Sequence, residues 1–344
     1  MSKISRLLKV DASLLPLQVG YQEQESTLCI GLDIAWFGGS KGDPSSRYDF
    51  LAVAYIDSHL SVKEVACVRV PLKNHDLAAE KTVERLIALA EKYKSDRIVL
   101  AIDAPLQAAP RRLPKREPIS KKGTVERRAC EHYLNCKRKS IDNAFGGAKG
   151  WHPNIQPGAP LAPRVEALLS ELNHSFKLWT RESSQQRNLI IECFPAEAIW
   201  GAKRMGWFPD GVSSNQAKEY KKQRGKTLTA KGVTDLVEAI LLPFGRVCTG
   251  NAWKSKIVDY ALKTILEDSD SLWKDGDDYP GGKMLDDVVD SLICLATAIS
   301  YSAGLAHVWQ DLNQPLDGHI IGPGSMQELH TGVTSVSAPE GSNA

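Results

Sequence analysis

Short apolar runs and two helical stripes dominate the pattern of hydrophobic and polar positions along the chain. Residues 28–34, 97–106 and 188–196 are almost continuously apolar, which is typical of strands buried on both faces of a sheet. Residues 50–57 and 61–70 predict two further strands, and the short link between them indicates an antiparallel hairpin. These runs together predict a β-sheet whose central strands are covered on both sides.

Helical spacing appears in two stretches. In residues 76–94 and 285–304, apolar side chains return every three or four positions. Residues 318–323 are expected to form a last short strand or a turn. The order of three strands, helix, strand, insertion, strand, insertion and helix predicts the α/β class, with a mixed β-sheet flanked by helices.

The composition suggests three parts of unequal size. Residues 1–26 are expected to form an N-terminal extension. Residues 27–323 are expected to form one domain, with basic and helical insertions at about 107–185 and 203–284. Residues 324–344 are rich in Gly, Ser and Thr and predict a disordered tail.

Cysteine usage and hydropathy predict a cytoplasmic protein. The seven cysteines are scattered and odd in number, and no pair has the CxxC spacing of a zinc finger, so we expect reduced thiols. No apolar run reaches the ~18 residues that a bilayer-spanning helix needs. No secretory signal precedes the first strand.

Charge is balanced overall but separated along the chain. The 43 basic and 41 acidic residues exclude a histone-like tail and an acidic disordered chain. Residues 111–139, however, hold eleven basic side chains against three acidic ones, and residues 218–231 hold six against one. Such segments suit a phosphate backbone, although a solvated charged surface is the alternative. The candidate nucleic-acid-binding residues are Arg111, Arg112, Lys115, Arg116, Lys121, Lys122, Arg127, Arg128, Lys221, Lys222 and Arg224.

Acidic residues occur where burial would normally exclude them. Asp33, Asp103 and Glu192 lie at or near the ends of three apolar runs, and Asp287 and Asp290 lie in the first turns of the last helix. A buried carboxylate must be paired or bind a metal. Taken singly, each acid could instead cap a turn, complement a helix dipole or, for Glu192, pair with an arginine.

Together these acids indicate a metal centre, because neighbouring strands would bring them to one end of the sheet. Oxygen ligands without His or Cys favour Mg²⁺ or Mn²⁺. Two such ions about 3.5–4 Å apart can activate water and stabilise the leaving oxygen of a phosphodiester. We therefore expect two ions.

Six motifs, in their order along the chain, resemble a known family. They are GLDIAW, AIDAPL, RRACEHYL, ECFPAE, KKQRGKTLTAKG and DDVVDSLICLATA, and they span roughly residues 27–323. The family is domain-of-unknown-function family 429, which is described as predicted nucleases with an RNase H-like fold. The DxxD pair of the last helix also resembles the end of Holliday-junction resolvases of that fold.

The resemblance implies functional roles for individual residues. Asp33, Asp103, Asp287 and Asp290 would be metal ligands, although the resolvases have Glu where this chain has Asp103. Glu192 matches the ECFPA-like motif. Arg128 and Glu131 match an R-x-C-[DE] motif that would face the substrate.

The leading hypothesis is a two-metal, RNase H-like nuclease with Asp33, Asp103, Glu192, Asp287 and Asp290 as catalytic residues. Its partner would be nucleic acid, DNA or RNA, with a protein partner or a homo-oligomer left open. An actin-like or sugar-kinase-like phosphotransferase is one alternative, but the second lobe and the Gly-rich adenosine loop that it needs are not evident. A non-catalytic nucleic-acid-binding module is the other.

Overall fold

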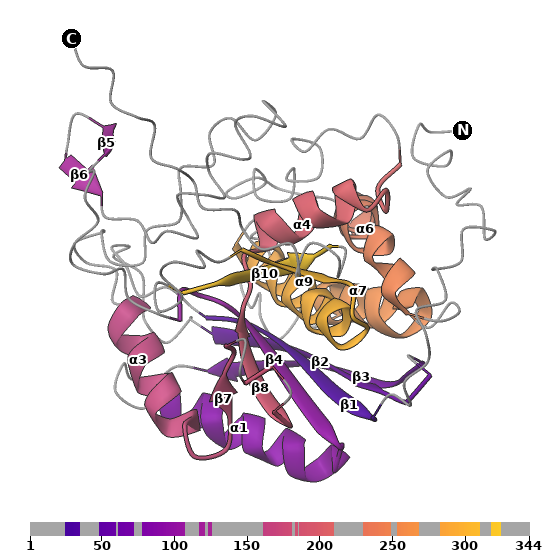
Figure 1. Cartoon of the computed structure of the whole chain (residues 1–344). Coiled ribbons are helices and arrows are strands. Elements are labelled where there is room, and N and C mark those ends of the chain that lie inside the picture. The colour runs from indigo at the N-terminus through magenta and orange to yellow at the C-terminus, as the bar shows by residue number, and fades with distance from the viewer. Residues whose placement is uncertain are drawn as a thin grey trace.

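A six-stranded mixed sheet lies at the centre of the protein in the computed structural model (Figure 1). The structure describes residues 25–34, 48–59, 61–71, 78–106, 117–120, 123–125, 161–180, 183–184, 186–209, 230–248, 253–267, 283–309 and 318–324. The sheet strands are β1 (Thr27–Asp33), β2 (Tyr48–Ile56), β3 (Val62–Pro71), β4 (Arg97–Asp103), β7 (Lys177–Leu178) and β8 (Asn188–Glu192). Their order is β3-β2-β1-β4-β8-β7.

The two halves of the sheet differ in strand direction. β2 pairs antiparallel with β1 and with β3, as the hairpin predicted from the sequence requires. β4 pairs parallel with β1 and β8, and β7 pairs parallel with β8. The parallel strands β1, β4 and β8 lie in the three apolar runs and are covered on both faces, as such runs predict, although β8 ends at Glu192 and residues 195–196 of its run begin α4.

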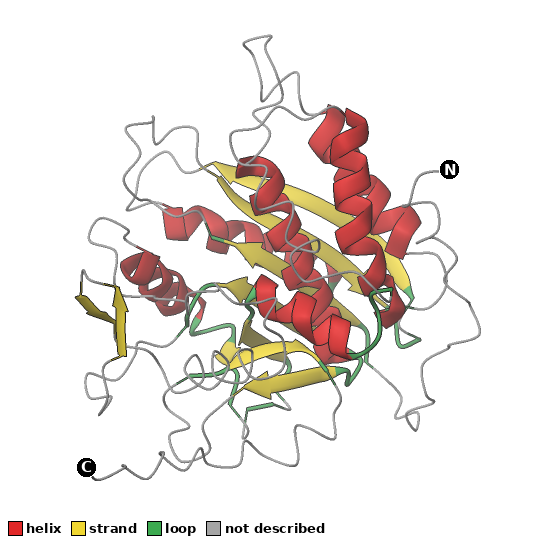
Figure 2. Ribbon diagram, turned by 90° about the horizontal axis from the view of Figure 1, so that it is seen from above, coloured by secondary structure: helices red, strands yellow, loops and turns green. Residues whose placement is uncertain are grey.

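Helices cover both faces of the sheet. One face, below the sheet in Figure 1, carries α1 (Ala78–Tyr93) and α3 (Leu161–Leu172) and is called the back face. The other, which faces the viewer in Figure 2, carries α9 (Lys283–Ser302) and is called the front face. The π-helix η6 (Trp253–Val258) and α7 (Asp259–Glu267) contact β3 beside α9, and α4 (Pro195–Arg204), α6 (Ala230–Leu241) and the 3₁₀-helix η5 (Leu242–Val247) pack against α9. Each face has its own buried apolar cluster, so the sheet separates two cores.

Two small hairpins complete the described elements. β9 (Ala306–Trp309) pairs antiparallel with β10 (Ile320–Pro323), and β10 touches the end of β8 through a bridge between Cys193 and Ile321. β5 (Glu117–Ser120) pairs with β6 (Gly123–Val125). The region expected as an insertion at 107–185 therefore also contains α3 and β7, which belong to the layers of the sheet.

The expected terminal segments fall almost entirely outside the described residues. Of the extension at 1–26 only residues 25–26 are described, and of the tail at 324–344 only residue 324. Among the helices that the structure describes, none is both long and apolar enough to cross a bilayer.

Candidate functional site

Asp33 and Asp103 end neighbouring parallel strands. They are directly paired in the register of β1 and β4, so their backbones are separated by one inter-strand spacing, about 4.8 Å. Only 7% of Asp33 and 9% of Asp103 is exposed. The sequence places these residues 70 positions apart, and the sheet makes them neighbours.

Both side chains point to the front face. Side chains alternate along a strand, so Asp33 shares its face with Cys29, and Asp103 shares its face with Ala101. Cys29 and Ala101 belong to the front core. The carboxylates also act on Cys294 of α9: burial raises the pKa of this thiol, Cys193 raises it further, and Asp103 and Asp33 add to the increase. Both carboxylates therefore lie on the side of the sheet that α9 covers, close enough to Cys294 to affect its pKa.

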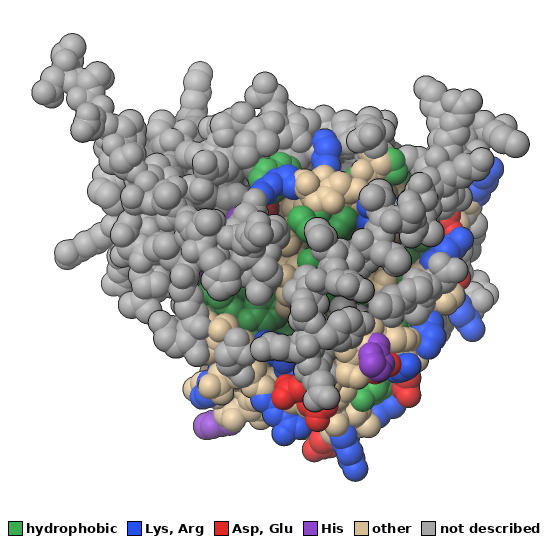
Figure 3. Space-filling model, turned by 45° about the vertical axis from the view of Figure 1, so that its right-hand side comes forward, with side chains coloured by type: hydrophobic (Ala, Val, Ile, Leu, Met, Phe, Trp, Pro, Cys, Tyr) green, Lys and Arg blue, Asp and Glu red, His purple; other side chains and the backbone are tan. Residues whose placement is uncertain are grey.

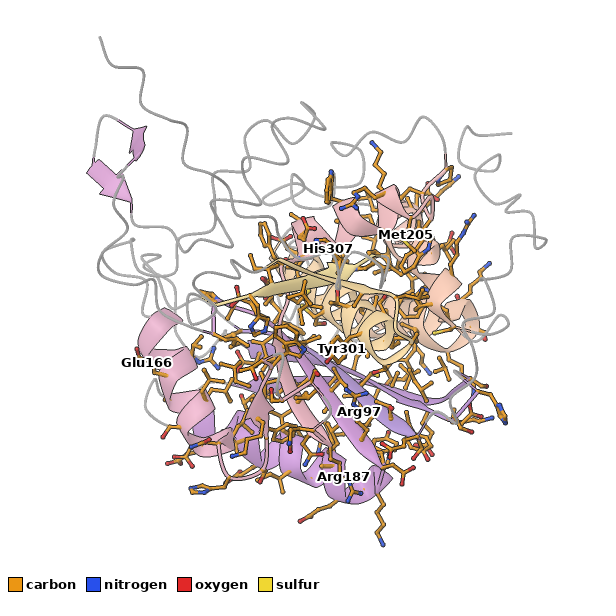
Figure 4. All side chains as sticks on the ribbon, viewed as in Figure 1. Arg97, Glu166, Arg187, Met205, Tyr301 and His307 are labelled. Atoms are coloured by element: carbon orange, nitrogen blue, oxygen red, sulfur yellow. The ribbon has the colours of Figure 1, made fainter. Side chains whose placement is uncertain are left out.

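Helix α9 runs antiparallel to β1 and points its first turns toward this acidic pair. At the other end of the sheet, the Sγ atom of Cys29 lies 3.5 Å from the hydroxyl of Ser302. The Arg97 guanidinium, at the start of β4, lies 5.5 Å from the centre of the Tyr301 ring (Figure 4). The last turn of α9 is therefore at the opposite end of the sheet from the acids.

The acids of α9 consequently lie at the Asp33 end. Asp290 is 5% exposed and precedes Cys294 by four residues, which places both on one stripe of the helix. Asp287, three residues earlier, and Asp286 are half-buried. The structure thus brings Asp33, Asp103, Asp287 and Asp290 to the same end of the front face.

A glycine permits the close approach of α9 to the sheet. A Cβ atom at Gly31 would lie 2.0 Å from the carbonyl oxygen of Ser291 and 2.2 Å from the backbone nitrogen of Leu295. Any side chain at this position would have to move the helix backbone. Gly31 is two residues before Asp33 and on the same face, so it sets the height of α9 above the acidic pair.

Glu192 occupies the same end of the sheet but the opposite face. It is paired in register with Ile102, and its neighbour on the same face of β8 is Ile190; both isoleucines belong to the back core. The Glu192 side chain is fully buried, and its Oε2 accepts the backbone N–H of Leu106 at 2.9 Å. Its position therefore differs from that of the four aspartates.

Another buried acid was not singled out in the sequence. Asp49 of β2 is fully buried and lies on the back face. Its Oδ2 accepts a hydrogen bond from the Thr82 hydroxyl at 2.8 Å and forms an ion pair with Nη2 of Arg164, which is 7% exposed. The sequence could have pointed to Asp49, because it is an acid within the mostly apolar run YDFLAVAYI, like the acids that were singled out.

The basic residues expected to bind nucleic acid lie outside the part of the chain whose side chains are described, as do Arg128 and Glu131. On the face shown in Figure 3, described Lys and Arg side chains are interspersed with Asp and Glu. The expectation of a basic surface therefore rests on residues 111–139 and 218–231 of the sequence.

The donor chemistry of the front-face acids fits a hard divalent cation. Asp33, Asp103 and Asp290 offer only carboxylate oxygens, which Mg²⁺ and Mn²⁺ prefer. Within the described residues, no three His, Cys, Asp or Glu side chains stand close enough to hold a metal ion as they are. Binding would therefore require the aspartates to turn toward one another.

A family model matches residues 43–313 of the chain, and its description is protein of unknown function (DUF429). The chain belongs to this family, as the motifs indicated. The match contains Asp103, Glu192, Asp287 and Asp290 and begins after Asp33. No curated protein and no solved structure matches the chain.

Proposed function

We propose that the protein is a metal-dependent nuclease with an RNase H-like fold that hydrolyses phosphodiester bonds of nucleic acid. The observation that carries the proposal is the register pairing of Asp33 with Asp103 beneath the acidic first turns of α9. Three antiparallel strands followed by parallel strands on the other side of β1 support the RNase H-like assignment.

Each acid has a role in this proposal. Asp33, Asp103, Asp290 and Asp287 would hold the ions through their carboxylate oxygens. Bound Mg²⁺ or Mn²⁺ would supply water activation and neutralise charge on the phosphate. The buried setting of the aspartates limits competing solvent and strengthens their electrostatic effect.

The substrate class follows from the charges of the sequence. An acidic centre alone repels a polyanion, so a nucleic acid must be held by cations elsewhere. The basic segments at 111–139 and 218–231 would provide these contacts; in the chain the first follows strand β4, which ends at Asp103, and the second follows helix α4.

The test is cleavage of labelled single- and double-stranded DNA and RNA by the full chain, with Mg²⁺, Mn²⁺ or EDTA. Asp33→Asn should reduce metal-dependent cleavage to background while the circular dichroism spectrum is unchanged. Asp259→Asn, at an exposed position of α7, is the matched control and should keep full activity.

Three outcomes would contradict the proposal. Full cleavage by Asp33→Asn would remove the acidic pair from the mechanism. ATP turnover with a small substrate and no cleavage of nucleic acid would favour a phosphotransferase, and salt-sensitive binding without hydrolysis would favour a binding module.

A further inference from the structure

Asp103 is held on both sides by consecutive residues at the end of β8. Before Asp103, the carbonyl oxygen of Ile102 accepts the N–H of Cys193 at 2.9 Å. After it, the N–H of Leu106 donates to Oε2 of Glu192 at 2.9 Å. The five residues from Ile102 to Leu106 are therefore anchored at both ends to the ECFPA motif.

Glu192 is itself fixed in place. Its own N–H donates to Nε2 of His319 at 3.4 Å, and the His319 ring lies 4.8 Å from the ring of Trp179. Glu192 is fully buried, and His319 and Trp179 are 1% and 4% exposed. The backbone of Glu192 is thus held in place, and its buried carboxylate is directed at the Leu106 amide.

Glu192 lies on the opposite face of the sheet from the proposed metal ligands. A ligand of the ions held by Asp33 and Asp103 must reach the front face. Glu192 leaves β8 on the back face, beside Ile102, and its carboxylate already accepts the N–H of Leu106, three residues after Asp103.

We infer that Glu192 is a positioning residue that orients Asp103 through the Leu106 amide and is not a metal ligand. The inference rests on the proposed function, because it assigns Asp103 to the metal centre. The same hydrogen bond also fixes Leu106, where this described stretch of the chain ends.

The experiment compares Glu192→Gln, Glu192→Ala and Asp103→Asn in the full chain. Glutamine keeps an oxygen that can accept the Leu106 N–H, whereas alanine does not. Glu192→Gln should retain Mn²⁺ stoichiometry, measured by electron paramagnetic resonance titration, and most of the cleavage rate. Glu192→Ala should lose about 10–100-fold in rate, as removal of an outer-shell partner does. Asp103→Asn should lose bound Mn²⁺.

The outcomes separate a positioning residue from a ligand. If Glu192→Gln loses Mn²⁺ and activity as Asp103→Asn does, Glu192 is a ligand and the inference fails. If Glu192→Ala cleaves at the wild-type rate, the hydrogen bond positions nothing. Glu192→Gln preserves volume, so it decides the question even where Glu192→Ala does not fold.

Hydrogen exchange distinguishes failure of the inference about Glu192 from failure of the proposed nuclease function. The peptide spanning residues 103–106 should exchange faster in Glu192→Ala than in wild type, with Glu192→Gln close to wild type. Unchanged exchange in Glu192→Ala would overturn the inference. A wild-type chain that neither binds Mn²⁺ nor cleaves, yet shows the exchange difference, would overturn the nuclease alone.

Discussion

The two faces of the sheet treat buried acids differently at the same end of the strands. On the back face, Asp49 is neutralised by Arg164 and bonded by Thr82, and Glu192 accepts a backbone N–H. On the front face, Asp33 and Asp103 are placed next to each other, and α9 adds Asp290. On the back face the described partners of the acids belong to the fold, whereas the pairing of Asp33 with Asp103 is what the proposed metal centre rests on.

The largest effect is expected from breaking the back-face ion pair. Asp49→Asn would leave the Arg164 guanidinium buried without its counter-charge, which lowers the free energy of unfolding by about 3–5 kcal/mol. Urea denaturation in EDTA measures this change. The double variant Asp49→Leu with Arg164→Met removes both charges and should recover much of the loss. An equal loss in single and double variants would mean that packing, rather than the ion pair, stabilises this region.

A smaller effect is expected where α9 meets β1 on the front face. Gly31→Ala forces a methyl group against the backbone of Ser291 and Leu295, which should lower the free energy of unfolding by about 1–3 kcal/mol. Because α9 moves away from Asp33, Mn²⁺ affinity should fall as well. Gly206→Ala is the contrast, because a Cβ at Gly206 meets no atom within 4 Å, although its φ of 69° makes that substitution mildly strained. Unchanged Mn²⁺ binding in Gly31→Ala would mean that the height of the helix does not control the site.

Much of the fold was predictable because the buried strands are long apolar runs. The strands expected at 28–34, 50–57, 61–70 and 97–106, and the helix expected at 285–304, are confirmed within a few residues. Helices were expected in the insertions without individual bounds, and α3, α6 and α7 lie there, but the two-residue strand β7 and the helix α4 were not predicted. Their packing depends on residues distant in the chain, as the contacts of Trp179 with Tyr301 and His319 illustrate.

The convergence of the acids was predictable, but their division between faces was not. A strand that is apolar on both sides has no alternation of polar and apolar residues, so the sequence does not show which face each residue is on. Glu192 was therefore grouped with Asp33 and Asp103. Only the register with Ile102 places it on the back face. The partnership of Asp49 with Arg164 joins residues that are 115 positions apart, and no local pattern signals it.

Removing one front-face acid should raise the free energy of unfolding, whereas removing Asp49 should lower it. Asp33→Asn relieves the repulsion between neighbouring carboxylates, so the free energy of unfolding in EDTA should rise by about 1–2 kcal/mol. Saturating Mn²⁺ should stabilise the wild type and leave the variant unchanged. Thermal unfolding with and without Mn²⁺ measures both effects. A variant that is less stable than wild type in EDTA would show that Asp33 serves the fold, as Asp49 does.

The smallest effect is a difference in alkaline stability between the faces. Burial raises the pKa of Cys29, on the front face, to about 12 from an ordinary value of 9.0. The folded chain therefore keeps a proton that the unfolded chain releases, and the stability present below pH 9 is lost as the pH rises toward 12. Between pH 8 and pH 9.5 this single thiol should contribute about 1 kcal/mol of the decline. Urea denaturation at both pH values should show a smaller decline for Cys29→Ala than for wild type. The control is Leu86→Ala on the back face, which should lower the free energy of unfolding at both pH values and leave its decline with pH as in wild type. Equal declines in all three proteins would mean that Cys29 does not contribute.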